Sequence, residues 1–253
     1  MLAALIFFTR LPWWKLGSPS REAFARVITF FPWVGWISGG LMAGCYALGD
    51  TLFSPMVGII LAIISRLLIT GCLHEDGLAD FFDGFGGGTD REGVLRIMKD
   101  SHIGTYGVVS LIGYFLLLSS LWYELGRLLP LSWCLFAFDP IGRSCSALVT
   151  MTLPYARDVE SCKAKVLYSS LSLSETFISL AGGLLPFAAL CIFVNPYVAI
   201  GLIGPVLITL LLVYIMLRRI GGYTGDCCGA VFLLSELSIP VILIPLLRLW
   251  PIG

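Results

Sequence analysis

Long apolar runs are the feature that most constrains this chain. Several of them reach the roughly 20 residues that an α-helix needs to cross a bilayer. In lipid every backbone N–H and C=O needs a partner inside the protein, so these segments must be helices. Hydrophobic residues make up 58% and charged residues 13% of the chain. A soluble domain carries about 25% charged residues. The sequence therefore predicts an all-α, polytopic transmembrane helix bundle.

Hydropathy predicts about seven transmembrane spans, and we expect residues 1–253 to form a single integral membrane domain. The turn at Asn195-Pro196 separates the fifth span from the sixth. The expected spans cover residues 27–49, 52–73, 104–123, 129–153, 173–194, 196–217 and 229–250.

The basic residues are distributed unevenly between the two sides of this predicted bundle. Of 16 Lys and Arg, twelve precede the first span or follow the second, fourth and sixth, and two lie on the other side. Because cytoplasmic loops carry the basic excess, we expect the N-terminus in the cytoplasm and the C-terminus outside. The polar loops 74–101, 155–165 and 218–228 then face the cytoplasm. The net charge is zero, so no basic excess indicates nucleic acid.

An acidic motif after the second span is the sharpest chemical signal. At about 100° per helical residue, Asp80 and Asp83 fall within about 40° of Asp76, whereas Glu75 points elsewhere. Three carboxylates on one face repel one another unless a cation lies between them, and their hard oxygens suit Mg²⁺ or Mn²⁺. A solvated acidic helix start is the alternative. It is disfavoured because residues 77–82 add small and apolar side chains but no basic partner.

Two neighbouring stretches add candidates. The run Gly84–Gly88 is either a loop that approaches phosphate or a helix end. Lys99 and Ser101 could bind phosphate oxygens, and Asp100 could join the metal or orient a hydroxyl. An ordinary basic loop is the alternative for this segment. His102 is expected to be structural.

Charged residues also occur inside the predicted spans. Asp139 and Arg143 are four residues apart, so they could form an internal ion pair, or Arg143 could turn toward an anionic substrate. We expect Arg66 to extend its guanidinium toward the membrane surface. Glu236 is a functional candidate, as intramembrane carboxylates generally are.

The loop between the last two spans combines glycines with polar residues. Thr224 and Asp226 lie in the segment 221–230, which suggests close backbone approach to phosphate or a nucleotide, with a tight turn as the alternative. Asp226 is the residue here that could extend the metal site.

Six motifs, in this order over nearly the whole chain, together resemble the cobalamin synthase family, the adenosylcobinamide-GDP ribazoletransferases. Glu75 departs from the family pattern, which more usually has an apolar residue there. The motifs are Phe8-Thr9-Arg10-Leu11-Pro12, Phe31-Pro32-x-Val34-Gly35, His74-x-Asp76-Gly77-Leu78-Ala79-Asp80-x-x-Asp83-Gly84, Ile97-Met98-Lys99-Asp100-Ser101-x-Ile103-Gly104, Tyr155-Ala156-Arg157 and Gly222-x-Thr224-Gly225-Asp226-x-x-Gly229-Ala230.

The resemblance implies a Mg²⁺-dependent transfer at phosphorus. Adenosylcobinamide-GDP and α-ribazole, or its 5′-phosphate, would give adenosylcobalamin or its 5′-phosphate and GMP. Metal binding falls to Asp76, Asp80 and Asp83, and either Asp100 or Asp226 completes the metal shell or accepts the hydroxyl proton. The remaining implied contacts are Lys99 in catalysis, and Arg10, Ser101, Arg143, Arg157 and Thr224 in substrate binding.

The resemblance further implies a bacterial cytoplasmic (inner) membrane location, with the site facing the cytoplasm. The expected partners are the two substrates and the lipid bilayer. A homo-oligomer and contact with other corrinoid-pathway enzymes are left open. Two rival functions would use similar acidic residues. A CDP-alcohol phosphotransferase would need an Arg where Asp80 stands and a second acidic half. An ion transporter would place its acids near the bilayer midplane, often in repeated halves, and no second copy of the motif occurs.

Overall fold

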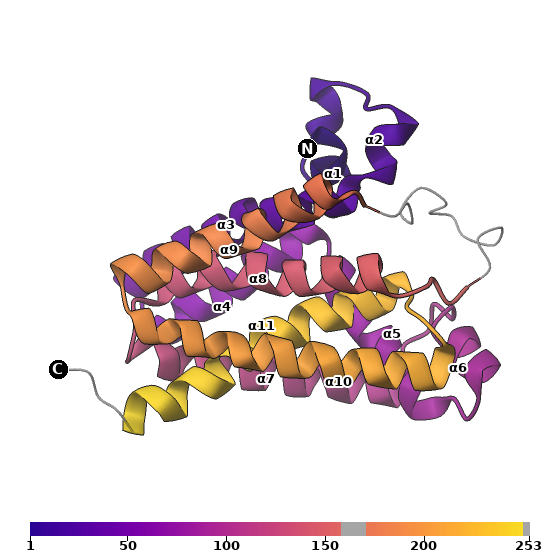
Figure 1. Cartoon of the computed structure of the whole chain (residues 1–253). Coiled ribbons are helices and arrows are strands. Elements are labelled where there is room, and N and C mark those ends of the chain that lie inside the picture. The colour runs from indigo at the N-terminus through magenta and orange to yellow at the C-terminus, as the bar shows by residue number, and fades with distance from the viewer. Residues whose placement is uncertain (158–170, 250–253) are drawn as a thin grey trace.

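The computed structural model describes residues 1–157 and 171–249 (Figure 1). Within these residues every named element is helical, as predicted, and one isolated bridge joins Tyr155 to Tyr223. The elements are α1 (Leu2–Phe8), η1 (Trp13–Leu16), α2 (Arg21–Ala25), η2 (Val27–Phe30), α3 (Phe31–Leu52), α4 (Pro55–Thr70), α5 (Leu73–Gly87), α6 (Arg91–Ile97), α7 (Thr105–Gly126), α8 (Leu131–Thr152), α9 (Leu173–Phe193), η4 (Pro196–Leu202), α10 (Ile203–Ile220) and α11 (Gly225–Leu249).

The long helices α3, α4, α7, α8, α9, α10 and α11 lie side by side and alternate in direction (Figure 1). Contacts at one end of the bundle show which helix ends lie together. The Arg10 N–H donates to the Ile69 carbonyl at the end of α4 at 2.7 Å. Arg26 lies 3.0 Å from Glu175 in the first turn of α9. The short helices α1, α2, α5 and α6 gather at this same end, which we call the site end.

Five helical segments of the described residues are long and apolar enough to cross a membrane: Val27–Leu52, Thr105–Gly126, Leu173–Phe193, Pro196–Ile220 and Gly225–Leu249. The chain is therefore a multi-pass membrane protein. The pair α4 and α5 would add a sixth span only if counted together across a bend of 91°. In this part of the chain, fewer than the predicted seven spans are both long and apolar enough. Helix α4 has 16 residues, and Asp139 and Arg143 lower the mean hydropathy of α8.

The bend between α4 and α5 has a local cause. Gly71 and Cys72 both adopt left-handed backbone conformations, with φ of 65° and 58°. Gly71 ends α4, and α5 starts two residues later in a new direction. The acidic motif therefore leaves the line of the predicted second span, and α5 lies across the end of the bundle. The predicted helix over the acids is confirmed, and it continues to Gly87.

Two glycines let α5 cross α11 with the backbones in contact. A Cβ atom on Gly77 would lie 2.9 Å from the Asp226 carbonyl oxygen, and one on Gly229 would lie 2.8 Å from the His74 carbonyl oxygen. Any larger side chain would push the helices apart. The crossing therefore brings the acids of α5 next to Asp226 at the start of α11.

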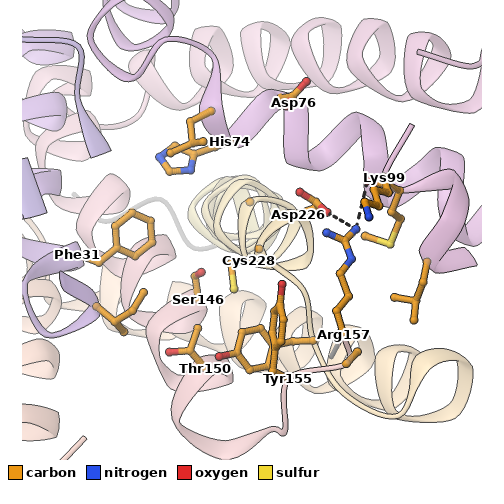
Figure 2. Close-up of a pocket in the computed structure, with 18 of the residues that line it drawn as sticks. Phe31, His74, Asp76, Lys99, Ser146, Thr150, Tyr155, Arg157, Asp226 and Cys228 are labelled. Carbon is orange, nitrogen blue, oxygen red and sulfur yellow. Dashed lines mark hydrogen bonds and ion pairs between the residues drawn. The ribbon is translucent and has the colours of Figure 1, made fainter. Parts of the chain in front are cut away.

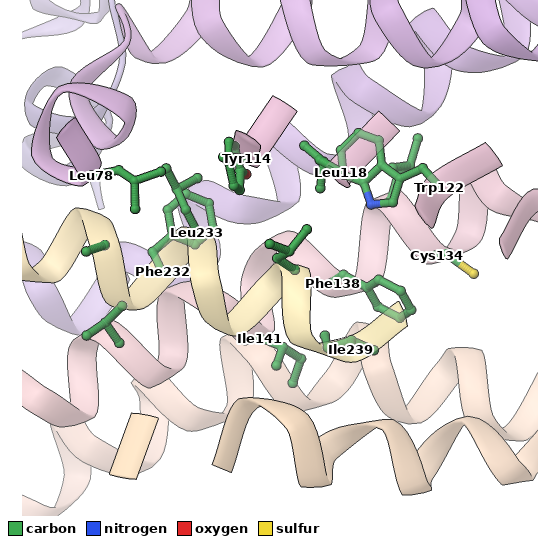
Figure 3. Packing of buried hydrophobic residues seen from close by; sticks show 14 of the residues in the cluster. Leu78, Tyr114, Leu118, Trp122, Cys134, Phe138, Ile141, Phe232, Leu233 and Ile239 are labelled. Atoms are coloured by element: carbon green, nitrogen blue, oxygen red, sulfur yellow. The ribbon is translucent and has the colours of Figure 1, made fainter. Parts of the chain in front are cut away.

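The apolar core lies between α7, α8 and α11 and reaches α5 (Figure 3). Two fully buried arginines lie within it. Arg66 donates to Glu236 at 2.5 Å and to the Tyr114 hydroxyl at 2.8 Å. Our expectation that Arg66 reaches the membrane surface is wrong, because a buried acid and a buried hydroxyl hold its guanidinium inside the bundle.

The second buried arginine forms the internal pair that the sequence allowed. Arg143 donates to Asp139 at 2.5 Å and to the Ser38 hydroxyl at 3.1 Å. The ring of Phe232 lies beneath both guanidinium groups. Its centroid is 5.7 Å from Arg66 Cζ and 4.6 Å from Arg143 Cζ. The two pairs join α3, α4, α7, α8 and α11.

Candidate active site

A cavity of about 990 Å³ opens at the site end of the bundle (Figure 2). Helices α1, α5, α6, α8 and α11 and the segment 155–157 contribute to its wall. Polar and aromatic side chains share the lining, so the cavity could hold a large ligand with both anionic and apolar parts. Its charged and polar lining residues are His74, Asp76, Arg91, Glu92, Arg96, Lys99, Ser146, Thr150, Arg157 and Asp226, and its aromatic ones are Phe7, Phe8, Phe31, Tyr155 and Tyr223.

Two of the predicted acids, Asp76 and Asp226, line the cavity at the crossing of α5 and α11. Asp76 is exposed on α5, and Asp226 lies in the first turn of α11. Asp80 follows one turn after Asp76 and is half-buried. Burial raises the pKa of Asp80 to about 7, and the negative charge of Asp226 adds to the increase. A nearby cation would relieve this repulsion.

Asp83 has a different environment from the other acids. Its Oδ2 accepts the Gly104 N–H at 2.7 Å, and its Oδ1 accepts the Gly107 N–H at 2.8 Å. Both oxygens therefore cap the start of α7, where the helix leaves backbone N–H groups unpaired. In residues 1–157 and 171–249, neither Asp76 nor Asp80 has a hydrogen-bond partner for its carboxylate.

A magnesium ion fits this donor set. Among the described residues no group of three His, Cys, Asp or Glu side chains forms a ready-made metal cage. Mg²⁺ does not require one, because it commonly binds one or two carboxylates and completes its shell with water and substrate phosphates. Asp76 and Asp80, with Asp226 close enough to raise the pKa of Asp80, offer hard oxygens in this way, and Mn²⁺ could use the same oxygens.

Cationic side chains complete the wall. Arg157 lies 3.2 Å from Asp226 Oδ2, as the dashed line in Figure 2 marks. It also donates to the Met98 carbonyl at 3.3 Å. Lys99 lines the cavity just beyond α6, and its ammonium group is available to an anion. The acids and cations that the sequence predicts in one site therefore share one cavity in the case of Asp76, Lys99, Arg157 and Asp226.

Sequence reasoning gave Arg91 no role, yet it helps to build the site. Its guanidinium donates to the Ala156 carbonyl at 2.7 Å and to the Ile220 carbonyl at 3.0 Å. This contact ties the end of α8 and the end of α10 to the start of α6. No local pattern could have revealed it, because both acceptors are backbone atoms of distant segments.

Two predicted residues lie on an exposed loop outside the cavity lining. The Asp100 carboxylate accepts hydrogen bonds from the His102 backbone at 3.0 Å and from its ring at 2.7 Å. These bonds lower the pKa of Asp100. Ser101 between them is also exposed. His102, expected to be structural, has this carboxylate as its partner.

Three other predicted residues, Arg10, Thr224 and Arg143, lie outside the cavity lining. The Arg10 side chain packs against Gly71, where an added Cβ would meet its Nε atom at the α4–α5 bend. Thr224 is buried, and its hydroxyl accepts the Cys227 N–H at 3.3 Å in the first turn of α11. Arg143 is buried and does not line the cavity.

The glycine run after the acids forms a helix end, one of the two predicted alternatives. Residues to Gly87 continue α5, and Gly88 ends it. A Cβ on Gly84 would lie 2.3 Å from Met98, and one on Gly88 would lie 2.6 Å from the Val94 backbone nitrogen. The glycines therefore allow α6 to pack tightly on α5.

The fold and site define a class: an all-helical, multi-pass membrane protein with an acidic and cationic cavity at one end of its bundle. A family model described as cobalamin-5-phosphate synthase matches residues 1–244. The chain therefore belongs to the cobalamin-5-phosphate synthase family, which confirms the resemblance seen in the motifs. No solved structure matches it.

Similar proteins cover nearly the whole chain. A Vibrio cholerae serotype O1 protein named adenosylcobinamide-GDP ribazoletransferase is 36% identical over 251 residues, which are 98% of this chain and 94% of that protein. A protein of the same name from Shewanella sp. strain W3-18-1 is 37% identical over 246 residues, with coverage of 96% and 92%. Another from Shewanella woodyi is 37% identical over 237 residues, with coverage of 93% and 91%.

Proposed function

We propose that this protein transfers the adenosylcobinamide-phosphate moiety of adenosylcobinamide-GDP to α-ribazole or α-ribazole 5′-phosphate and releases GMP. The family match over almost the whole chain carries this proposal. The cavity agrees with it, since a volume of about 990 Å³ with aromatic and charged walls suits a bulky diphosphate. Neither the CDP-alcohol phosphotransferase nor the transporter alternative has such support.

In the proposed reaction a ribose hydroxyl forms a new P–O bond to the phosphorus nearer the corrinoid, and the P–O bond to GMP breaks. Such transfers depend mainly on positioning and on neutralising charge. Lys99 and Arg157 would hold the outer phosphate oxygens. Asp226 would accept the hydroxyl proton or complete the metal shell. We prefer it to Asp100, whose carboxylate is bonded to His102 outside the cavity.

Mg²⁺ would neutralise the diphosphate charge and stabilise the leaving phosphate of GMP when bound. Asp76 and Asp80 are its proposed protein ligands. Asp83 lies on the same helix face, but its two hydrogen bonds to α7 give it a second task. It sets the distance between α5 and α7, and it could bind the ion only through its remaining lone pairs.

We further propose that all seven long helices, including α4 and α8, cross the bacterial inner membrane and that the site end faces the cytoplasm. Two observations support this orientation. The seven helices alternate in direction, and ten of the twelve basic residues on one side of the predicted bundle belong to the site end, while Lys163 and Lys165 lie outside the described residues. A water-soluble nucleotide substrate would then reach the cavity directly.

The experiment is a GMP-release assay on purified protein in detergent or nanodiscs. We expect GMP from adenosylcobinamide-GDP only when both α-ribazole and Mg²⁺ are present. Asp76→Asn should remove the activity, whereas Asp50→Asn, an exposed acid on α3, should not. Folded wild-type protein that releases no GMP would contradict the proposal, and ion flux through proteoliposomes would favour the transporter instead.

A further inference from the structure

His74 is a buried polar residue on the cavity wall for which the proposed reaction has no role. It lies in the first turn of α5, two residues before Asp76, and is 3% exposed (Figure 2). Its ring contacts Phe31 at a centroid distance of 5.5 Å and Phe232 at 4.8 Å. Aromatic rings on two sides therefore hold the imidazole in one orientation.

The contact with Arg143 determines which ring nitrogen carries the proton. His74 Nε2 lies 3.3 Å from Arg143 Nη1. A guanidinium can only donate hydrogen bonds, so Nε2 must accept. The neutral ring then carries its proton on Nδ1. Asp139 and Ser38 in turn hold the guanidinium at 2.5 Å and 3.1 Å.

The second ring nitrogen has no protein acceptor. Within residues 1–157 and 171–249, His74 Nδ1 makes no hydrogen bond. It is also not among the unpaired atoms sealed inside the bundle, so it retains access to the cavity that the residue lines. The cavity wall thus presents a fixed N–H donor with nothing to receive it, close to the acids and cations of the site.

We propose that His74 is a further substrate-contacting residue, which donates its Nδ1–H to an anionic phosphate-ester oxygen bound in the cavity. Arg143 and Asp139 are positioning residues, because they fix the tautomer that makes this donation possible. The assignment deepens the proposed function and rests on it. It also explains why a fully buried ion pair lies directly behind a cavity wall.

The tautomer can be tested without any activity. The chain has two histidines, so ¹⁵N-histidine NMR of the whole protein in nanodiscs gives two imidazole signals, and a His102→Asn variant assigns them. We expect His74 to carry its proton on Nδ1. A proton on Nε2 in wild-type protein would overturn the inference, whether or not GMP release is observed.

Two substitutions separate the Nδ1–H donor of His74 from its Nε2 contact with Arg143. In His74→Asn the amide NH₂ takes the place of Nδ1–H, but the Nε2 acceptor is lost. In His74→Gln the amide oxygen can still accept from Arg143, but no donor remains at Nδ1. We expect His74→Gln to lose roughly 10- to 100-fold in kcat/KM for adenosylcobinamide-GDP, as for one hydrogen bond to a charged group, and His74→Asn to lose less.

Equal losses in the two folded variants, or a larger loss in His74→Asn, would overturn the substrate contact. These outcomes are distinct from a failure of the proposed function. If wild-type protein releases no GMP, the proposed function fails, and the tautomer remains measurable.

Discussion

The bundle contains two groups of charged side chains that differ in one respect. The buried ion pairs, Arg66 with Glu236 and Arg143 with Asp139, each join a guanidinium to a carboxylate at 2.5 Å, with no exposure to solvent. The site acids are Asp76 and Asp226, which line the cavity, and Asp80, one turn after Asp76 on α5. Among the described residues, their only ion-pair partner is Arg157. Paired charges hold helices together, whereas unpaired carboxylates leave room for a ligand.

This difference qualifies a common inference about membrane proteins. Intramembrane charges are treated as functional by default. Here the fully buried charges, including Glu236, form ion pairs with one another inside the bundle. Helix α5 connects the two groups, because Glu75 lies 3.7 Å from Arg66 while Asp76 faces the cavity. Five substitutions or conditions test the comparison.

The largest effect should follow from breaking a buried pair. Arg66→Met leaves Glu236 as an unpaired buried acid, so we expect a loss of about 3–5 kcal/mol in the free energy of unfolding. Thermal unfolding in detergent measures it. A double variant that also carries Glu236→Met should recover part of the loss, because Glu236 then leaves no unpaired charge and only Glu75 still lacks the Arg66 partner. A single variant as stable as wild type would show that the pair does not stabilise the fold.

Asp80→Asn should act on turnover instead. Loss of one charge-stabilising group in the reacting site typically costs roughly 10²–10³ in rate. The variant should fold at least as well as wild type, because the substitution removes the repulsion of Asp80 by Asp226 and Asp76. GMP release and thermal unfolding on the same preparation separate the two effects, and substantial activity would contradict the assignment.

Gly77→Ala should disturb the crossing that brings the site acids together. Its Cβ would lie 2.9 Å from the Asp226 carbonyl oxygen, and overpacking of this kind costs about 1–3 kcal/mol. Turnover should fall as Asp226 moves away from Asp76. Gly44→Ala is the matched control, because no atom lies within 4 Å of a Cβ there. Equal effects in the two variants would mean that the crossing is not tight.

A smaller effect should appear in the pH dependence of stability. Asp80 has a pKa of about 7 in the folded protein against 3.8 unfolded, so the folded state binds more protons between these values. Metal-free protein should therefore lose stability as the pH rises from about 4 to 7. Mg²⁺ should restore it by binding the ionised acids. Thermal unfolding over this range checks the slope, which should be smaller in Asp80→Asn, where only Asp226 retains a raised pKa among these acids.

Glu75→Gln should have the smallest effect. Neither oxygen of Glu75 accepts a hydrogen bond in the described part of the chain, and Arg66 retains Glu236. An amide of the same shape should change the unfolding free energy by less than about 1 kcal/mol, and turnover should remain near wild type. A large loss of either would place Glu75 among the essential charges.

Much of this fold could be predicted because its signals are local. Apolar runs of bilayer length must form helices, and five of the expected spans correspond to helices that are long and apolar enough. The spacing of Asp76 and Asp80 places both on one face of α5, which the structure confirms as a helix. The order of the motifs was enough to indicate the family.

Tertiary structure decided which charges are free. Arg66 and Glu236 are 170 residues apart, and Asp83 and Gly107 are 24 apart, so no local pattern could pair them. The long apolar runs determined by themselves that the chain folds as membrane-compatible helices, since hydropathy and backbone hydrogen bonding act within each segment. Helix crossing alone determined that Asp76 and Asp226 share one cavity and that Arg66 and Arg143 do not, because a charge in a helix bundle is free or paired according to what a distant helix places beside it.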